Sequence, residues 1–597
     1  MKHKDIPFLP TSRAEMQKYG WDELDILLVT GDCYVDHPSF GIAVIGRVLL
    51  NKGYRVGIIA QPDWKDPAAL QVMGRPVICC GVTAGNMDSM VNIYTAARRL
   101  RRSDAYSENG ETGKRPPHAV VVYTQLAKRA FPGLPVFIGG IEASLRRVAH
   151  YDYWQDKMRQ SVIVDAKADV LSFGMGERSV VEIVRMLEIN KPLRGIRGTA
   201  CLLGKKEAER FNPEKYIELP SWEEMKSDRD ALMRSTVIIE REMNPMNGRG
   251  LFQRYGDRLL VLEPPAQPLD TDELDRVHDL GFSCLPHPEY KKSIPAFETI
   301  KHSVPAVRGC PGGCAFCGLV SHQGRGVRSR SQESIIREIK RMVKRSNFRG
   351  TVSDIGGAAG NILYNSPRDI EKCRNCKRIS CLFPKACSNY DANGKPLIGL
   401  LRKIRAIPEV KHLYLNSGIR LDLAVRQKEL MQEIIRHHVS GHMKVAPEHL
   451  HPNVLKLMRK NPAEDFYKFK DFFEETSGDA GKEQYLIPLF ISNFPGCTAK
   501  DMKTVDDYLN DHNWSPQQVQ DYIPLPMTMG AAMYYTGKTA DGTPIKVNRG
   551  LAERRPQMNV LKKKRSTSSS GKYHAESNKR SRSSRHSRGR NSGKRSL

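Results

Sequence analysis

The chain has 597 residues, of which 40% are hydrophobic, and a formal net charge of +28 at pH 7. This length exceeds what a single hydrophobic core supports, so we expect about three domains. The first twenty residues contain no apolar run, and no apolar stretch is long enough to cross a membrane, so neither a secretion signal nor membrane insertion is predicted. We therefore expect a cytoplasmic protein whose 13 cysteines act as ligands or core residues rather than as disulfides.

Residues 1–195 alternate short apolar segments with helical ones. The segment Phe40–Asn51 is predicted to be a helix, because its apolar residues recur at helical spacing. Such alternation indicates an α/β fold with a doubly wound, Rossmann-like sheet. The predicted strands are Leu24–Val29, Arg55–Ala60, Val77–Val82, His118–Tyr123, Pro135–Gly139 and Asp169–Phe173.

Residues 196–295 show little periodicity and contain the Pro-rich segment Glu263–Asp270, so we predict a connecting region. The alternation resumes in residues 296–560, where polar loops follow the strands. This pattern predicts a partial TIM-type barrel, whose functional groups lie at the ends of the strands. The predicted barrel strands are Thr351–Ile355, His412–Leu415, Met443–Ala446 and Tyr485–Ile491.

Residues 561–597 consist mainly of Ser, Arg, Lys, Gly and Asn. Such a segment buries too little apolar surface to fold, so we predict a disordered basic tail. Its positive charge can bind RNA by releasing counterions from the phosphates, and the alternative is a charged end that only keeps the protein in solution.

Three cysteines, Cys310, Cys314 and Cys317, follow a C-x3-C-x2-C spacing. Three thiolates on one loop can hold three corners of a four-iron cluster and leave the fourth iron open for a ligand. A zinc ion would need a fourth ligand, and none lies close by in the sequence. The sequence therefore predicts a 4Fe-4S cluster with an open iron.

A second group of cysteines has a C-x2-C-x4-C-x5-C spacing within a polar segment that would not fold unaided. Structural zinc is the first interpretation of this group, and an auxiliary iron–sulfur cluster is the second. Free thiols are the remaining alternative, because residue type alone does not separate the metals. The four residues are Cys373, Cys376, Cys381 and Cys387.

The spacing of the first three cysteines resembles that of the radical S-adenosylmethionine enzymes, and nearly the whole chain is similar to the YgiQ-type family. The resemblance also rests on Asp32–Gly41, Ile138–Arg146, Asn416–Arg420 and Lys444–His449. It implies that the open iron binds S-adenosylmethionine and that the reduced cluster cleaves it to a 5'-deoxyadenosyl radical. It further implies a flavodoxin- or ferredoxin-like reductant and an N-terminal domain over the barrel. The substrate, RNA or a small molecule, is left open.

The resemblance also implies which residues contact S-adenosylmethionine. An aromatic residue before the third cysteine packs on the adenine, and a Gly-Gly segment binds the methionine amino group. Polar residues after two later strands contact the ribose or the carboxylate, although an ion pair between Arg420 and Asp422 is the plainer alternative. The candidates are Phe316, Gly356, Gly357, Ser417, Arg420 and Glu448.

No catalytic acid or base is assigned. His449 is expected to be structural and Cys497 to be a buried thiol, as lone residues of these types usually are. One departure from the family pattern is Phe494, which stands where a His is expected before Pro495-Gly496.

Some radical S-adenosylmethionine enzymes begin with a cobalamin-binding domain of the Rossmann type. Their cobalt-ligating signature is D-x-H-x-x-G, whereas this chain has Asp36-His37 with a different spacing. We therefore expect no cobalt ligation by His37 and no cobalamin, although binding without a His ligand stays open. The competing class of function is a non-enzymatic iron–sulfur or RNA-binding protein, but electron-transfer clusters usually have four cysteine ligands.

Overall fold

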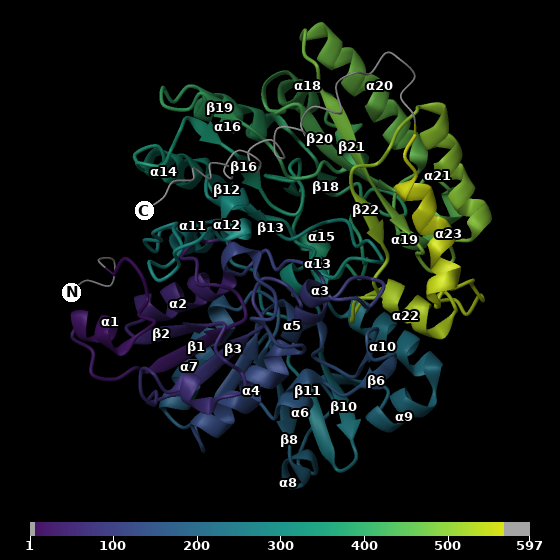
Figure 1. The fold of residues 1–597 in the computed structure, drawn as a ribbon. Helices are drawn as coiled ribbons and strands as arrows, with labels where there is room; N and C mark the ends of the chain where they lie inside the picture. The colour runs from purple at the N-terminus through teal and green to yellow at the C-terminus, as the bar shows by residue number, and fades with distance from the viewer. Residues whose placement is uncertain (1–5, 566–597) are drawn as a thin grey trace, which may run out of the picture.

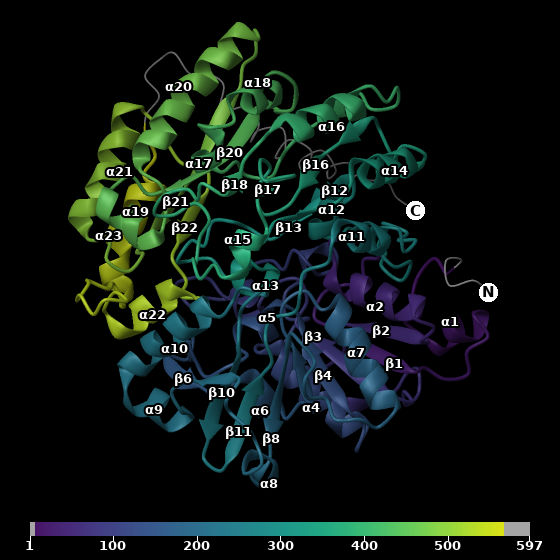
Figure 2. The ribbon, with the colours of Figure 1, turned by 180° about the vertical axis from the view of Figure 1, so that it is seen from behind.

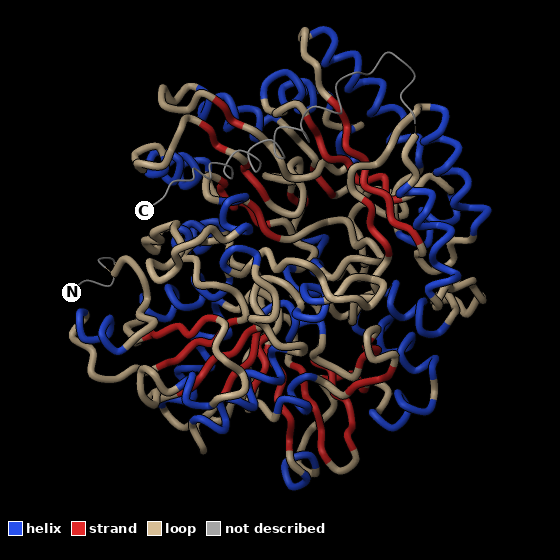
Figure 3. Tube along the Cα trace, in the orientation of Figure 1, coloured by secondary structure: helices blue, strands red, loops and turns tan. Residues whose placement is uncertain are grey.

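The computed structural model describes residues 6–565, which form two α/β units that lie one above the other in Figure 1. The lower unit comes from the purple to blue part of the chain, and the upper unit from the green and yellow part. Figure 3 shows the strands of the two units as separate groups with loops between them. The two predicted α/β parts are therefore present.

The lower unit is built on a nine-stranded sheet, and its first five strands in spatial order, β2-β1-β3-β4-β7, are parallel. Helices such as α2 (Gly41–Asn51), α4 (Ala119–Ala130) and α7 (Glu177–Glu188) connect and cover these strands. β1 is buried along its whole length, as expected where helices cover both faces of a parallel sheet. This arrangement confirms the doubly wound sheet. The five strands are β1 (Ile26–Thr30), β2 (Val56–Ala60), β3 (Cys79–Thr83), β4 (Val136–Gly139) and β7 (Val170–Ser172).

The predicted strand His118–Tyr123 is wrong, because this segment opens helix α4. The run Ala-Val-Val-Val-Tyr is rich in strand-forming residues, but a short apolar run does not distinguish a buried helix from a strand. In the structure Ala119, Tyr123, Leu126 and Ala130 lie buried on one face at helical spacing. Packing of this face overrides the local preference.

The stretch from residue 196 to 295, expected to be a connecting region, contributes four more strands to the same sheet. β8 pairs antiparallel with β7 and β11, β10 pairs antiparallel with β11, and β9 lies parallel to β10 at the edge. The first unit thus continues past residue 195, because the edge of β7 supplies hydrogen-bond partners that local periodicity does not reveal. The strands are β8 (Thr199–Leu203), β9 (Tyr216–Glu218), β10 (Gly250–Tyr255) and β11 (Arg258–Leu262).

The upper unit is a partial barrel of parallel strands, as predicted. β12 pairs with β16, β15 with β19, and β20 with β21, which pairs with β22. An isolated parallel bridge between Ile419 and Val445 links the first strands to β20. The strands are β12 (Ser303–Pro305), β15 (Thr351–Val352), β16 (Asp354–Gly356), β19 (His412–Leu413), β20 (His442–Glu448), β21 (Tyr485–Ser492) and β22 (Val519–Asp521).

Amphipathic helices cover the outside of these strands in Figure 2. In α14, for example, Ile335, Ile339 and Met342 are buried on one face, and Ser331 caps the helix by accepting from the N–H of Ser334. The helices are α14 (Gln332–Met342), α16 (Lys395–Arg405), α18 (Lys428–His437), α19 (Pro452–Met458), α20 (Ala463–Asp479) and α21 (Ala499–Asp511).

The last described helix, α23 (Leu551–Lys562), runs into the segment predicted to be a tail. Leu561 is buried, and Arg565 pairs with Asp506 at 2.6 Å. Folded structure therefore extends to about residue 565, and the rest of the predicted tail lies outside the described residues. No helix within residues 6–565 is long and apolar enough to cross a membrane.

Candidate active site

The loop with the first three cysteines lies between the two units, between β13 (Val307–Arg308) and helix α13 (Leu319–Gln323). The thiols of Cys310, Cys314 and Cys317 are half-buried. A cavity of about 30 Å³ adjoins Cys314 and Cys317. The three thiols lie near enough for their charges to interact, although within residues 6–565 they do not converge around a single ion. The thiolates of a four-iron cluster bind separate irons, so three thiols on one loop without a fourth cysteine suit a cluster with an open iron.

Burial disfavours the charged form of these thiols. It raises the pKa of Cys317 to about 12, and it raises the pKa of Cys310 against the opposing effect of the Arg420 charge. A positively charged iron centre offsets this effect, because a coordinated thiol is deprotonated by the metal. The donor set therefore fits an iron–sulfur cluster better than free thiolates.

A cavity of about 540 Å³, called the chamber below, lies between the ends of the strands of the two units. The sheet side is lined by Thr30, Thr83 and Ser172, at the carboxyl ends of β1, β3 and β7. This edge is where doubly wound sheets usually bind ligands. The barrel side is lined by residues that include Arg308, Leu319, Asp354, Gly356, Gly357 and Ser417.

The predicted Gly-Gly segment lies on the barrel side of the chamber, where the chain passes very close to its neighbours. A Cβ atom on Gly357 would lie 2.2 Å from Val307 Cγ1, and one on Gly356 would lie 2.4 Å from Asp354 Oδ2. Neither position has room for a side chain. Because both residues line the chamber, their backbone atoms form this part of its wall.

Asp354 holds the loop that contains Ser417. Its Oδ2 accepts from Ser417 Oγ at 2.6 Å, and its Oδ1 accepts from the N–H groups of Asn416 and Ser417 at 3.0 and 3.2 Å. Burial raises the pKa of Asp354, although these hydrogen bonds oppose the shift. The sequence pattern alone did not indicate Asp354 as a site residue. The feature that could have indicated it is its position on a predicted strand, two residues before Gly356.

Arg420 lies against the loop with the first three cysteines, called the cysteine loop below, and it does not line the chamber. Its Nη1 is 3.8 Å from Cys310 Sγ, and its guanidinium pairs with Asp422. A Cβ atom on Gly312 would lie 2.3 Å from Arg420 Nη1, so only a glycine lets the loop approach this closely. The plainer alternative, an Arg420–Asp422 ion pair, is therefore present together with a contact to the first cysteine.

Phe316 and Glu448 are not among the described residues that line the chamber. The Phe316 ring packs edge-on against the Phe494 ring, with 6.4 Å between the ring centres. Phe494, which departs from the family pattern, therefore contacts Phe316, which is predicted to bind the adenine. Glu448 is buried at the end of β20 with a positive φ of 67°, and Lys460 Nζ lies 3.9 Å from it. Burial raises the pKa of Glu448.

His449 and Cys497 are both engaged inside the protein. His449 is fully buried, its Nδ1 accepts from the His451 N–H at 2.9 Å, and its Nε2 is 3.5 Å from Cys497 Sγ. Burial lowers the pKa of His449 to about 3, so the ring stays neutral. These contacts support the structural roles expected for both residues.

The second cysteine group packs directly against the first. The N–H of Cys381 donates to the carbonyl of Pro311 at 2.9 Å, and Ser380 Oγ donates to the same oxygen at 3.2 Å. The short strands β17 (Ser366–Pro367) and β18 (Tyr390–Asp391) close this segment. Within residues 6–565, no three His, Cys, Asp or Glu side chains converge closely enough to hold one metal ion, so the group does not form a ready zinc tetrahedron.

His37 is buried outside the chamber lining that the structure describes, and its Nδ1 accepts from the N–H of Ser39 at 3.0 Å. Burial lowers the pKa of His37 to about 3. The neutral ring could still bind a metal, but its position outside the chamber lining keeps His37 away from a ligand bound there. The expectation that no cobalamin binds stays a prediction.

Two family models match the chain: radical SAM N-terminal over residues 8–303 and radical SAM superfamily over residues 304–474. The chain is 45% identical over 580 residues to a UPF0313 protein of Rhodopseudomonas palustris, covering 92% of this chain and 86% of the relative. It is 43% identical over 588 residues to the UPF0313 protein YgiQ of Shigella flexneri, covering 89% and 80%.

Among solved structures, the radical S-adenosylmethionine methyltransferase TsrM of Kitasatospora setae, with cobalamin and a 4Fe-4S cluster bound, is similar with a TM-score of 0.49 and 14% identity. The match covers 90% of this chain and 84% of that one. The high identity to the UPF0313 relatives over most of both chains decides the family. The protein belongs to the UPF0313, or YgiQ-type, family of radical S-adenosylmethionine enzymes.

Proposed function

We propose that this enzyme cleaves S-adenosylmethionine reductively at a 4Fe-4S cluster held by Cys310, Cys314 and Cys317, and that the radical acts on a substrate bound in the chamber. The observation that carries the proposal is the course of the cysteine loop. The loop leaves Arg308 and reaches Leu319, which both line the same chamber as Gly356, Gly357 and Ser417. When bound, the cluster supplies the electron that splits the sulfonium bond of the cofactor.

The surrounding residues orient S-adenosylmethionine and shield it from water. The backbone of Gly356 and Gly357 offers a surface for the methionine part, and Asp354 fixes Ser417 at the same wall. Arg420 supports the cysteine loop next to Cys310. The sheet of the first unit covers the barrel and so excludes water and oxygen from the reacting groups.

The test is anaerobic reconstitution, reduction with dithionite and measurement of 5'-deoxyadenosine after addition of S-adenosylmethionine. We expect Cys317→Ala to lose the cluster and the product. Cys201→Ala is the matched control, because Cys201 is a buried thiol of β8 that lines neither the chamber nor the cavity beside Cys314 and Cys317. A reconstituted protein with a full cluster that neither binds nor cleaves S-adenosylmethionine would falsify the proposal.

A flavodoxin- or ferredoxin-like reductant is proposed as the electron donor. We keep the prediction that no cobalamin binds, although the TsrM structure of Kitasatospora setae holds cobalamin. Gel filtration with hydroxocobalamin checks this prediction: we expect the pigment to separate from the protein, and co-elution in a fixed ratio would contradict it.

A further inference from the structure

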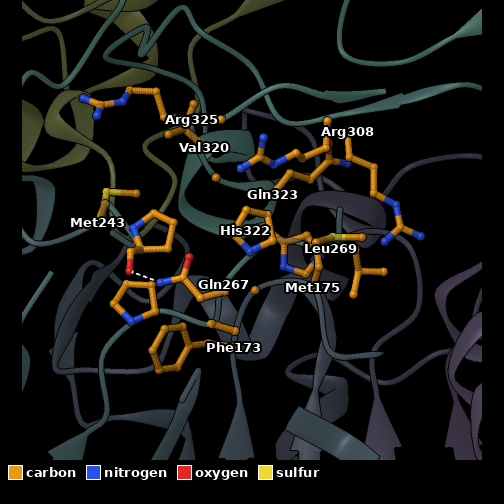
Figure 4. A pocket seen from close by; sticks show the side chains of 18 of the residues that line it. Phe173, Met175, Met243, Gln267, Leu269, Arg308, Val320, His322, Gln323 and Arg325 are labelled. Atoms are coloured by element: carbon orange, nitrogen blue, oxygen red, sulfur yellow. Dashed lines mark hydrogen bonds between the residues drawn. The ribbon is translucent and has the colours of Figure 1, made fainter. Parts of the chain in front are cut away.

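A pocket rich in arginine lies beside the chamber, and it is called the arginine pocket below. Its volume is about 90 Å³. It lies between helix α13, which follows the cysteine loop, and the Pro-rich segment 264–269; Figure 4 shows His322 between Phe173 and Val320 there. Arg308, His322 and Gln323 line both this pocket and the chamber, so the two cavities share a wall. The arginines that line it are Arg147, Arg178, Arg308, Arg325 and Arg328.

The positive charge of this pocket is not balanced by the described part of the chain. No Asp or Glu is among the described residues that line it. Glu273 pairs with Arg178, and Glu177 pairs with Arg308. Within residues 6–565 no carboxylate forms an ion pair with Arg147, Arg325 or Arg328. Arg325 also faces the thiols of Cys373 and Cys381, so the uncompensated cations are Arg147 and Arg328.

Arg147 is the most informative of the three, because it is only 5% exposed. Its Nη1 donates to the carbonyl oxygen of Ser144 at 2.6 Å, and its guanidinium lies 4.8 Å from the centre of the Phe173 ring. Burial lowers the pKa of Arg147 to about 10. A buried cation without a carboxylate partner is costly for stability, so its presence here needs a separate explanation.

A second arginine gives an independent indication of a missing partner. Arg328 Nε is shielded from solvent and has no hydrogen-bond partner within the described residues. Buried donors of this kind are normally satisfied. His322 adds no charge, because burial lowers its pKa to about 4. The donors therefore indicate a ligand that brings negative charge and several acceptor oxygens.

We propose that the arginine pocket binds the phosphate or diphosphate group of a small ligand, whose remaining part extends into the chamber. The planar arginine donors match phosphate oxygens in pairs. The volume of the pocket is well below the roughly 300–1,000 Å³ of sites that enclose whole ligands, so the pocket holds only one end of a molecule. Binding of this group does not depend on the radical chemistry proposed above.

The test is equilibrium titration of the full-length, cluster-reconstituted protein with pyrophosphate and with inorganic phosphate at physiological salt. We expect Arg147→Gln and Arg328→Gln each to weaken pyrophosphate binding at least tenfold. Arg258→Gln is the matched control, because Arg258 is an exposed arginine on β11 outside the pocket, and it should keep the wild-type affinity. The basic tail is present in all of these proteins, so it cannot cause the difference.

Thermal unfolding without added anion separates binding from folding. We expect Arg147→Gln to melt at the wild-type temperature or higher, and to lose the upward shift that pyrophosphate gives the wild type. If Arg147→Gln does not fold, Arg328→Gln decides, because the half-buried side chain of Arg328 pairs with no carboxylate in the described chain and does not line the cavity beside Cys314 and Cys317. Unchanged pyrophosphate affinity in Arg328→Gln overturns the proposal. An RNA oligonucleotide is titrated in parallel, and a loss confined to RNA overturns the proposal as well. Formation of 5'-deoxyadenosine is measured separately, so the two proposals fail independently.

Discussion

At the scale of single residues, Arg420 connects the cysteine loop with the loop after β19. Its guanidinium contacts Cys310 Sγ and pairs with Asp422, and both charged side chains are largely buried. Burial raises the pKa of Asp422, but the Arg420 charge outweighs this effect and holds the pKa below its ordinary value. The ion pair therefore both supports the loop and places a positive charge next to the first thiol.

We predict that Arg420→Gln lowers the free energy of unfolding by about 3 kcal/mol, because it leaves the buried carboxylate of Asp422 unpaired. The double variant Arg420→Gln/Asp422→Asn should recover most of this stability in thermal unfolding and still form less 5'-deoxyadenosine than the wild type. Full recovery of product by the double variant would show that the pair is only structural.

Residue types, spacing and the family resemblance point to the three cysteines and the Gly-Gly segment, because these features depend on the local chain; their roles as ligands stay predictions. They were not enough for Asp354, whose role depends on a hydrogen bond to Ser417, 63 residues away. The alternative for Arg420, an ion pair within its loop, is confirmed, but it describes only one of the two contacts of this side chain. Its contact with Cys310 joins residues 110 positions apart, and no local pattern indicates it.

At the scale of elements, segments with a clear apolar pattern were predicted well, such as the strand at β21 and the helix at α2. The errors have a common cause, which is pairing or packing between distant parts of the chain. The buried face of α4 is selected by its neighbours, and the strands from β8 to β11 exist because they extend the edge at β7.

The segment with the second cysteine group is held to the rest of the protein by hydrogen bonds more than by packing. Asn244 Nδ2 donates to the carbonyls of Cys373 and Cys376 at 3.1 and 3.0 Å, and Asn389 Nδ2 donates to Cys373 Sγ at 3.6 Å. The backbone is therefore held by hydrogen bonds from outside. Between residues 371 and 390 Leu382 is the one buried apolar residue, so a metal centre would supply stability that packing does not.

We predict that a triple variant with Cys310, Cys314 and Cys317 replaced by Ala still binds metal through the second group. Elemental analysis then separates zinc from iron. Further replacement of Cys376 and Cys387 by Ser should remove that metal and lower the melting temperature. A triple variant that holds neither zinc nor iron would contradict the prediction and leave the four thiols unliganded.

At the scale of the whole molecule, the chamber exists only because the two units face each other. Glu177 of the first unit pairs with Arg308 of the second, Ser144 Oγ lies 2.9 Å from His322 Nδ1, and Arg459 pairs with Glu240 at 2.8 Å. These contacts hold the strand ends of the sheet opposite those of the barrel. Residues of both units therefore line the chamber, so a ligand bound there would contact both of them.

The basic tail is the part of the chain for which RNA binding is proposed. The described structure ends with Arg565 paired to Asp506, so a truncation after residue 565 keeps every described residue. It removes nine of the Lys and Arg residues and one Glu. For each RNA phosphate that the shortened protein does not neutralise, the slope of log affinity against log salt should fall by about 0.7 for single-stranded RNA.

We predict that this truncation weakens retention on RNA at low salt and leaves the yield of 5'-deoxyadenosine unchanged. A scrambled tail of the same composition is the matched control and should bind as the native tail does, because counterion release depends on charge and not on residue order. The tail contains one aromatic residue, so base stacking would add little specificity. Filter binding over a range of salt concentrations measures the effect. Equal retention with and without residues 566–597 would assign any RNA contact to the folded units instead.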